Sequence, residues 1–185
     1  MTERYYPVDF LREVSQWSEA YEKWSEKLDT IDSQMKGYIL DYLKNEDFGH
    51  QETMKGIIER LPISSTRRLL IDMVQDMDMQ EGCCFTVRKR FPSRVTKKIN
   101  TYVNEYHFCY EKRKQIEAAL RNVVLGYMKE HHLEENPMAY KEIVAYLPAS
   151  FFRFNMYETY YELKEKNNQR ELVSKHQKKK DRECR

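Results

Sequence analysis

The stretch FLREVSQWSEAYEKWSEKLDTIDSQMKGYILDY, residues 10–42, decides the fold of this chain. Its large apolar side chains follow one another at alternating steps of four and three residues: Phe10, Val14, Trp17, Tyr21, Trp24, Leu28, Ile31, Met35, Tyr38 and Tyr42. A helix turns once every 3.6 residues, so this spacing places them on one face of a single long helix. An apolar face of this length cannot stay in water, and we expect it to pack along the whole helix.

The same pattern occurs a second time in VTKKINTYVNEYHFCYEKRKQIEAALRNVVLGY, residues 95–127. Each position follows its counterpart by 85 residues (95 − 10 = 85), and only Arg113 interrupts the apolar run. Tyr6-Pro7 and Phe91-Pro92 precede the two helices at the same offset. Residues 61–67 and 147–153 both read L-P-x-S-x-x-R, at an offset of 86 (147 − 61 = 86). The sequence therefore predicts an all-α, internally duplicated helical bundle.

Each repeat is expected to contain one long helix of about 35 residues followed by two shorter ones. The short helices are predicted near 52–61 and 137–147, and the third helices near 64–80 and 150–166. Asn136 before Pro137, and Ser64 and Ser150, are suited to cap helix N-termini. We expect a first unit at 1–83, a linker at 84–91, a second unit at 92–167 and a basic, disordered tail at 168–185. The two long helices are expected to pack on each other.

The composition suits a globular helical protein rather than a disordered or β-rich one. Charged residues make up 34% of the 185 residues, yet 32 basic and 30 acidic side chains leave a net charge of only +2. That balance gives no global field for nucleic acid or an anionic membrane. No apolar run approaches the roughly 18 residues of a membrane span, and the first residues do not resemble a secretory signal. The four cysteines show no paired CxxC spacing, which fits reduced thiols, so we expect a cytoplasmic protein without a membrane partner.

Two segments have the outline of a helix-turn-helix, residues 52–74 and 138–160. The third helix of the first repeat carries Arg67 and Arg68, and that of the second carries Arg153, as a major-groove reader would require. The turns, however, contain Pro62 and Pro148, although the familiar motif commonly places a glycine there. A helical hairpin of a bundle explains these segments equally well, with the arginines fixing the elbow between helices.

Local basic clusters keep nucleic-acid binding open as an alternative. A patch at 88–98 and the C-terminal tail contain several lysines and arginines that could contact phosphate or an acidic protein. The candidate contacts are Arg67, Arg68, Arg88, Lys89, Arg90, Arg94, Lys97, Lys98, Arg153, Lys178, Lys179 and Lys180. The simpler interpretation is that these residues keep the chain soluble. The acidic residues Asp72, Asp76 and Asp78 would oppose DNA near the end of the first third helix.

No catalytic, metal or cofactor site is predicted. The sequence contains no phosphate-binding loop, nucleophile elbow or dinucleotide-binding glycine pattern. His131-His132, with Glu134 and Glu135 nearby, is the one place that invites a metal, but adjacent histidines on a helix point in different directions. A bundle enzyme with scattered carboxylates would leave no linear motif.

The leading hypothesis is a protein-interaction module that binds through aromatic and methionine-rich helix faces. Its partner would be another protein or a second copy of the chain, as a homodimer. The alternative is a small DNA-binding regulator that uses the helix-turn-helix-like segments and the basic patch.

Overall fold

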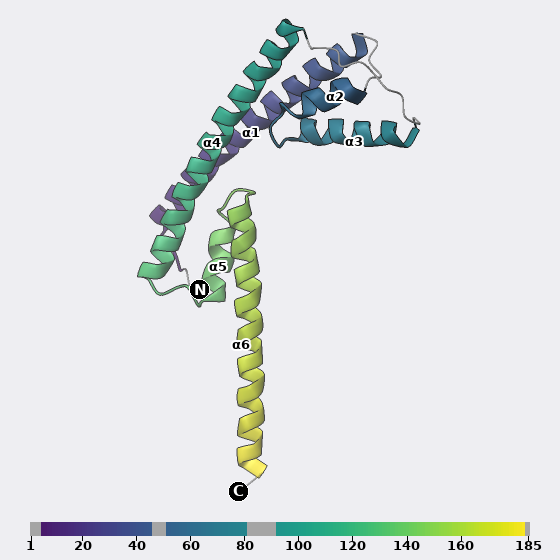
Figure 1. The fold of residues 1–185 in the computed structure, drawn as a ribbon. Helices are drawn as coiled ribbons and strands as arrows, with labels where there is room; N and C mark the ends of the chain where they lie inside the picture. The colour runs from purple at the N-terminus through teal and green to yellow at the C-terminus, as the bar shows by residue number, and fades with distance from the viewer. Residues whose placement is uncertain (1–4, 46–50, 81–91, 184–185) are drawn as a thin grey trace. The chain divides into compact units, whose positions relative to one another are not determined.

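The computed structural model describes residues 5–45, 51–80 and 92–183, and side chains within 5–45, 53–77 and 92–170. These residues form six α-helices and contain no β-strand (Figure 1). The helices are α1 (Val8–Asn45), α2 (Gln51–Ile58), α3 (Ser65–Gln80), α4 (Ser93–Glu130), α5 (Pro137–Val144) and α6 (Phe151–Glu183). The prediction of an all-α protein is therefore confirmed.

The two long helices are 38 residues each, slightly longer than predicted. Helix α6 differs more, because it continues to Glu183 through residues where the sequence predicted a disordered tail. Residues 164–183 contain neither glycine nor proline and are rich in Lys, Glu, Gln and Arg, all good helix formers. Polar composition alone thus did not reveal where this helix ends.

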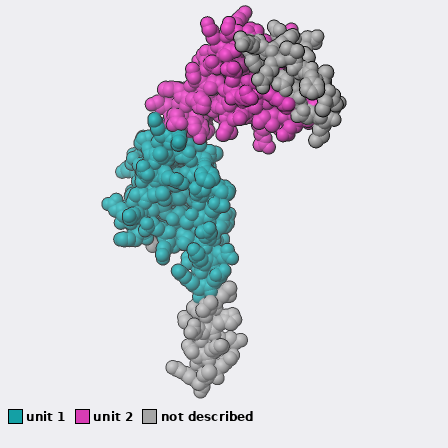
Figure 2. Space-filling view, viewed as in Figure 1, with its two compact units in different colours: residues 1–22, 114–185 teal, residues 23–113 magenta. Residues whose placement is uncertain are grey.

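The chain forms two compact units (Figure 2). Unit 1 comprises residues 1–22 and 114–185, and unit 2 comprises residues 23–113. Each long helix is therefore divided between both units, and each unit combines one part of α1, one part of α4 and two of the other helices. The repeat boundaries at 1–83 and 92–167 concern sequence similarity and stay a prediction. The expected linker, 84–91, lies outside the described residues.

Unit 1 has a core built from the first turns of α1, the last turns of α4, and helices α5 and α6. Its buried residues are Tyr6, Leu11, Val14, Leu120, Val124, Met128, Ala139, Tyr140, Ile143, Val144, Leu147, Phe152 and Met156. The ring centres of Phe10 and Tyr127 lie 4.1 Å apart at the edge of this core. Within this unit the two long helices therefore contact each other, as expected.

Unit 2 has a core built from the last turns of α1, the first turns of α4, and helices α2 and α3. Its buried residues are Met35, Ile39, Leu43, Met54, Ile57, Leu61, Leu70, Val74, Val95 and Ile99. Two aromatic pairs join the long helices here: the ring centres of Trp24 and Phe108 are 5.9 Å apart, and those of Tyr38 and Tyr102 are 6.1 Å apart.

Only part of the predicted seam of α1 is buried. The positions that are buried as predicted are Val14, Tyr21, Leu28 and Met35. The remaining buried positions fall one residue later than predicted, and they include Leu11, Ser18 and Ile39. The aromatic residues expected there, Phe10, Trp17 and Tyr38, are half-buried. Apart from Tyr21, the large rings of α1 lie along the edges of the seam, where there is more room than at the closest approach of the helices.

The predicted serine caps are confirmed. The Ser64 hydroxyl oxygen accepts a hydrogen bond from the backbone N–H of Arg67, and Ser150 accepts one from Arg153, each at 3.2 Å. Asn136 caps α5 through its side-chain oxygen. Each cap satisfies an amide of the first turn that has no partner within its own helix.

Carboxylates of the long helices provide further caps that the sequence did not reveal. Asp32, buried on α1, accepts hydrogen bonds from the Ser65 hydroxyl and from the backbone N–H of Thr66, the latter at 3.3 Å. Glu117 on α4 accepts one from the backbone N–H of Phe152 at 3.1 Å. Burial by itself raises the pKa of Asp32, but the hydrogen bonds from Ser65, Thr66 and Ser64 outweigh it and lower this pKa below its usual value. These contacts fix α3 and α6 to the long helices.

We expect Asp32→Asn to lower the free energy of unfolding by about 1–3 kcal/mol at neutral pH, because charge-assisted hydrogen bonds are weakened. The folded-state pKa is depressed, so the stabilisation is present above the unfolded value of 3.8 and is lost as pH falls through the lower folded pKa. The difference in free energy of unfolding between the variant and wild type should therefore shrink as the pH falls below 3.8. Urea unfolding at several pH values measures it, with the exposed Asp29→Asn as control. A difference that does not change with pH would contradict the ionised role of Asp32.

Candidate functional site

Helix α6 has apolar side chains on two opposite faces. On one face, Phe152 and Met156 are buried in the core of unit 1, and Tyr160 and Leu163 pack against them. The other face carries four exposed aromatic residues, which we call the aromatic stripe. Their side chains are Phe151 at 71% exposure, Phe154 at 55%, Tyr157 at 39% and Tyr161 at 62%.

The aromatic stripe is continuous because its members are three or four residues apart on one helix. The rings of Phe151 and Phe154 are stacked with centres 6.3 Å apart, and the Arg153 guanidinium lies 5.8 Å from the ring centre of Tyr157. At about 200 Å² for each aromatic side chain, the exposed fractions correspond to about 450 Å² in total. Patches of this size on a protein surface are often functional.

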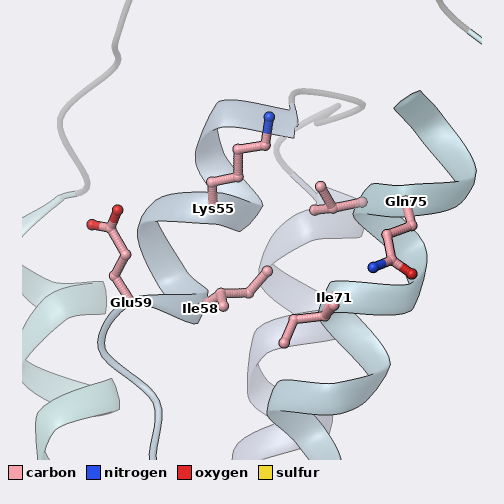
Figure 3. A pocket seen from close by; sticks show the side chains of 6 residues that line it. Lys55, Ile58, Glu59, Ile71 and Gln75 are labelled. Carbon is pink, nitrogen blue, oxygen red and sulfur yellow. The ribbon is translucent and has the colours of Figure 1, made fainter. Parts of the chain in front are cut away.

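Unit 2 contains an open groove of about 350 Å³ between α2 and α3 (Figure 3). The side chains of Ile58 and Ile71 point toward each other across it, and Val74 adds to its apolar wall. Three polar residues, Lys55, Glu59 and Gln75, complete the lining. The groove is a second apolar surface, but unlike the stripe it is lined by no aromatic residue.

Three of the predicted basic residues come together on unit 2. Arg94, Lys97 and Lys98, on the first turns of α4, line a depression of about 560 Å³. Tyr38, Ser93 and Thr101 complete its lining. The amine of Lys98 also lies 4.6 Å from the ring centre of Tyr102, as a cation–π contact.

Of the other predicted basic residues, those whose side chains the structure describes do not line this depression. Arg67 is half-buried on α3, where its Nε is buried without a hydrogen-bond partner, and Arg68 is exposed one residue later. Arg153 belongs to unit 1. Arg88, Lys89 and Arg90 lie outside the described residues, and for Lys178, Lys179 and Lys180 only the backbone of α6 is described.

The helix-turn-helix-like segments correspond to α2 and α3 and to α5 and α6. Reading a DNA base edge requires polar side chains that reach into the groove. The exposed side of α6 carries the aromatic stripe instead, and α3 exposes Asp72 and Asp76.

The histidine pair has a structural position. His132 follows the end of α4 and has a φ of 55°. The backbone N–H of Leu133 donates a hydrogen bond to the carbonyl oxygen of Met128 at 2.8 Å. This geometry closes the C-terminus of α4. His131 lies against Tyr127, with ring centres 4.1 Å apart. Within the described ranges, His, Cys, Asp and Glu do not gather in groups of three that could hold a metal ion.

Comparison with known proteins finds no family model, curated protein or solved structure that matches this chain. In the part of the chain that the structure describes, no helix has an apolar stretch long enough to cross a membrane. The site is therefore interpreted from its own chemistry.

The sequence predicted a helix near 150–166 but did not identify the aromatic stripe. Periodicity finds apolar residues on a helix but does not tell which of two apolar faces is covered. A comparison of the two repeats would have provided the missing signal. At an offset of 86, the stripe corresponds to Ser65, Arg68, Ile71 and Gln75 of α3.

The two faces of α6 should respond differently to truncation. Phe152→Ala removes a buried ring and should lower the free energy of unfolding by about 3–5 kcal/mol. Phe154→Ala changes an exposed ring and should alter it by no more than about 0.5 kcal/mol. Chemical denaturation of both variants checks this. A large loss of stability for Phe154→Ala would mean that the stripe is part of the core.

Proposed function

We propose that this chain is an internally duplicated protein-binding module whose partner-binding surface is the aromatic stripe of α6. The observation that carries the proposal is a set of four aromatic side chains exposed on the face opposite the core. The stripe is not needed for the fold, and its chemistry suits a protein partner.

Equivalent core positions support the duplication. Leu120, Val124 and Met128 of unit 1 follow Met35, Ile39 and Leu43 of unit 2 by 85 residues. Tyr140, Ile143, Leu147 and Met156 follow Met54, Ile57, Leu61 and Leu70 by 86 residues. Both sets are buried at the same places in their units.

Equivalent caps support the duplication independently of apolar periodicity. Ser64 and Ser150 cap the third helices with the same 3.2 Å hydrogen bond. The carboxylate of Asp32 accepts a hydrogen bond from the backbone N–H of Thr66, and that of Glu117 accepts one from Phe152. The two carboxylates are 85 residues apart, and the two donors are 86 apart. A chance resemblance between helical sequences does not require matching hydrogen bonds between distant residues.

The repeats differ where the aromatic stripe lies. Three of the four equivalent positions on α3 are polar, namely Ser65, Arg68 and Gln75, and the fourth is Ile71. Unit 2 forms its core with these residues in place, so the shared architecture does not require aromatic side chains there. Exposed aromatic groups cost solubility, and we attribute their presence in the second repeat to binding.

The chemistry of the stripe suits a protein surface. Tyr, Phe and Arg are enriched in protein interfaces, where aromatic rings bury a large area and lose few rotamers. The stripe combines two phenylalanines and two tyrosines with the half-buried Arg153. An amphipathic helix of a partner would fit such a face through residues at helical spacing.

A second candidate is a DNA-binding regulator, which the basic depression on unit 2 favours. Arg94, Lys97 and Lys98 line one depression with two hydroxyl side chains, Ser93 and Thr101. Such a group can bind phosphate oxygens without reading the sequence.

The aromatic stripe predicts which variant loses its partners. Phe154→Asp with Tyr161→Asp should abolish capture of partner proteins from extracts of cells that naturally produce the chain, because charge opposes burial of this face. The matched control is Gln169→Asp, which adds a carboxylate to an exposed position of α6. Quantitative mass spectrometry of captured proteins measures the difference. Equal capture by the stripe variant and the control would overturn the proposal.

The second candidate predicts salt-dependent binding to duplex DNA. Replacing Arg94, Lys97 and Lys98 by Gln should reduce the slope of log affinity against log salt by about 2–3 if all three contact phosphate. Fluorescence anisotropy at several salt concentrations measures this slope. If the wild-type chain does not bind duplex DNA at low salt, this candidate is ruled out.

A further inference from the structure

We infer that the aromatic stripe binds the same stripe of a second copy of this chain, with the two α6 helices parallel and in register. This rests on the proposed function, because it names the partner of the same surface. The inference is carried by the helical register of the stripe, by the charges on its flanks and by its area.

The stripe has the register of a short coiled-coil seam. With Phe154 at an a position, Tyr157 falls at d and Tyr161 at the next a. Lys164 occupies the next d position and Asn168 the following a position, and both are exposed. The apolar part of the seam therefore ends at Tyr161.

The flanks of the seam carry opposite charges. Arg153 takes the g position on one flank, and Glu158 and Glu165 take e positions on the other. In a parallel pair, each g residue meets the e residue five positions later on the partner helix. Arg153 of each copy would therefore meet Glu158 of the other, which gives two opposite-charge contacts per dimer.

An antiparallel pair would have the wrong charges. In that orientation the e flank of one helix faces the e flank of the other. If the helices cross near Tyr161, Glu158 of one copy lies opposite Glu165 of the other, and the two carboxylates repel each other. The charge pattern thus selects the parallel arrangement.

The area of the stripe places the pair among weak interfaces. Two patches of about 450 Å² bury about 900 Å² together, less than the roughly 1,200–2,000 Å² of stable complexes. We therefore expect a weak dimer, with a Kd of roughly ten to a few hundred micromolar.

Sedimentation equilibrium of the full chain over a range up to about 500 μM tests the pairing. Wild type should change from monomer to dimer as concentration rises, and Phe154→Asp with Tyr161→Asp should remain monomeric. Gln169→Asp should behave as wild type. Circular dichroism of each variant verifies that it is folded, which the exposed positions lead us to expect.

A charge exchange tests the orientation. Arg153→Glu and Glu158→Arg should each weaken self-association roughly tenfold, because both contacts in the dimer become repulsive. An equimolar mixture of the two variants should dimerise at least as well as wild type. In a mixed parallel pair, the new carboxylate of one variant meets the new guanidinium of the other, and the two unchanged side chains meet as in wild type. Glu162→Arg, the same charge change at an exposed position outside the seam, is the control.

The outcomes distinguish the inference from the proposed function. A wild-type chain that stays monomeric at all concentrations overturns the self-pairing, whereas stripe-dependent capture of another protein would leave the proposed function standing. A dimer that survives Phe154→Asp with Tyr161→Asp also overturns the inference, because the contact then lies elsewhere. If the mixture of Arg153→Glu and Glu158→Arg associates no more strongly than either variant alone, the parallel register is overturned.

Discussion

The two long helices carry more apolar surface than their neighbouring short helices can cover. Each is 38 residues long, about 57 Å at 1.5 Å per residue, whereas α2 and α5 have only eight residues each. Neither α2 nor α5 is therefore long enough to cover the long helix that precedes it. The structure meets this constraint by dividing each long helix between two units, where it packs against the other long helix and two further helices. All other features of the molecule are built on this division.

The sequence predicted the elements better than the contacts among them. Heptad spacing and the caps Ser64, Ser150 and Asn136 depend on neighbouring residues, and these predictions agree with the structure. The centre of the seam depends on side-chain size at the helix crossing, and Trp17 accordingly lies beside it while Ser18 is buried. The bonds of Asp32 and Glu117 join residues more than 30 positions apart, so no local pattern announced them.

The site illustrates the same limit in another form. Apolar periodicity placed α6 in the fold through Met156 and its neighbours, but it could not distinguish the covered face from the exposed one. Basic residues close in sequence were partly brought together, as Arg94, Lys97 and Lys98 show, whereas Arg67 and Arg153 lie in different units. Under the proposed duplication, positions that differ between the two repeats are those that a shared core leaves free.

The length of α6 has a consequence for its dynamics. From Lys164 to Arg170 no side chain is buried, so these turns are held mainly by their own backbone hydrogen bonds. An isolated helix of this kind is marginally stable in water and opens locally at a small free-energy cost. Its amide hydrogens should exchange with solvent faster than those of the turns around Phe152 and Met156. Any molecule that packs along α6 adds contacts to these turns and slows their exchange, so the backbone itself reports whether this face of the helix is occupied.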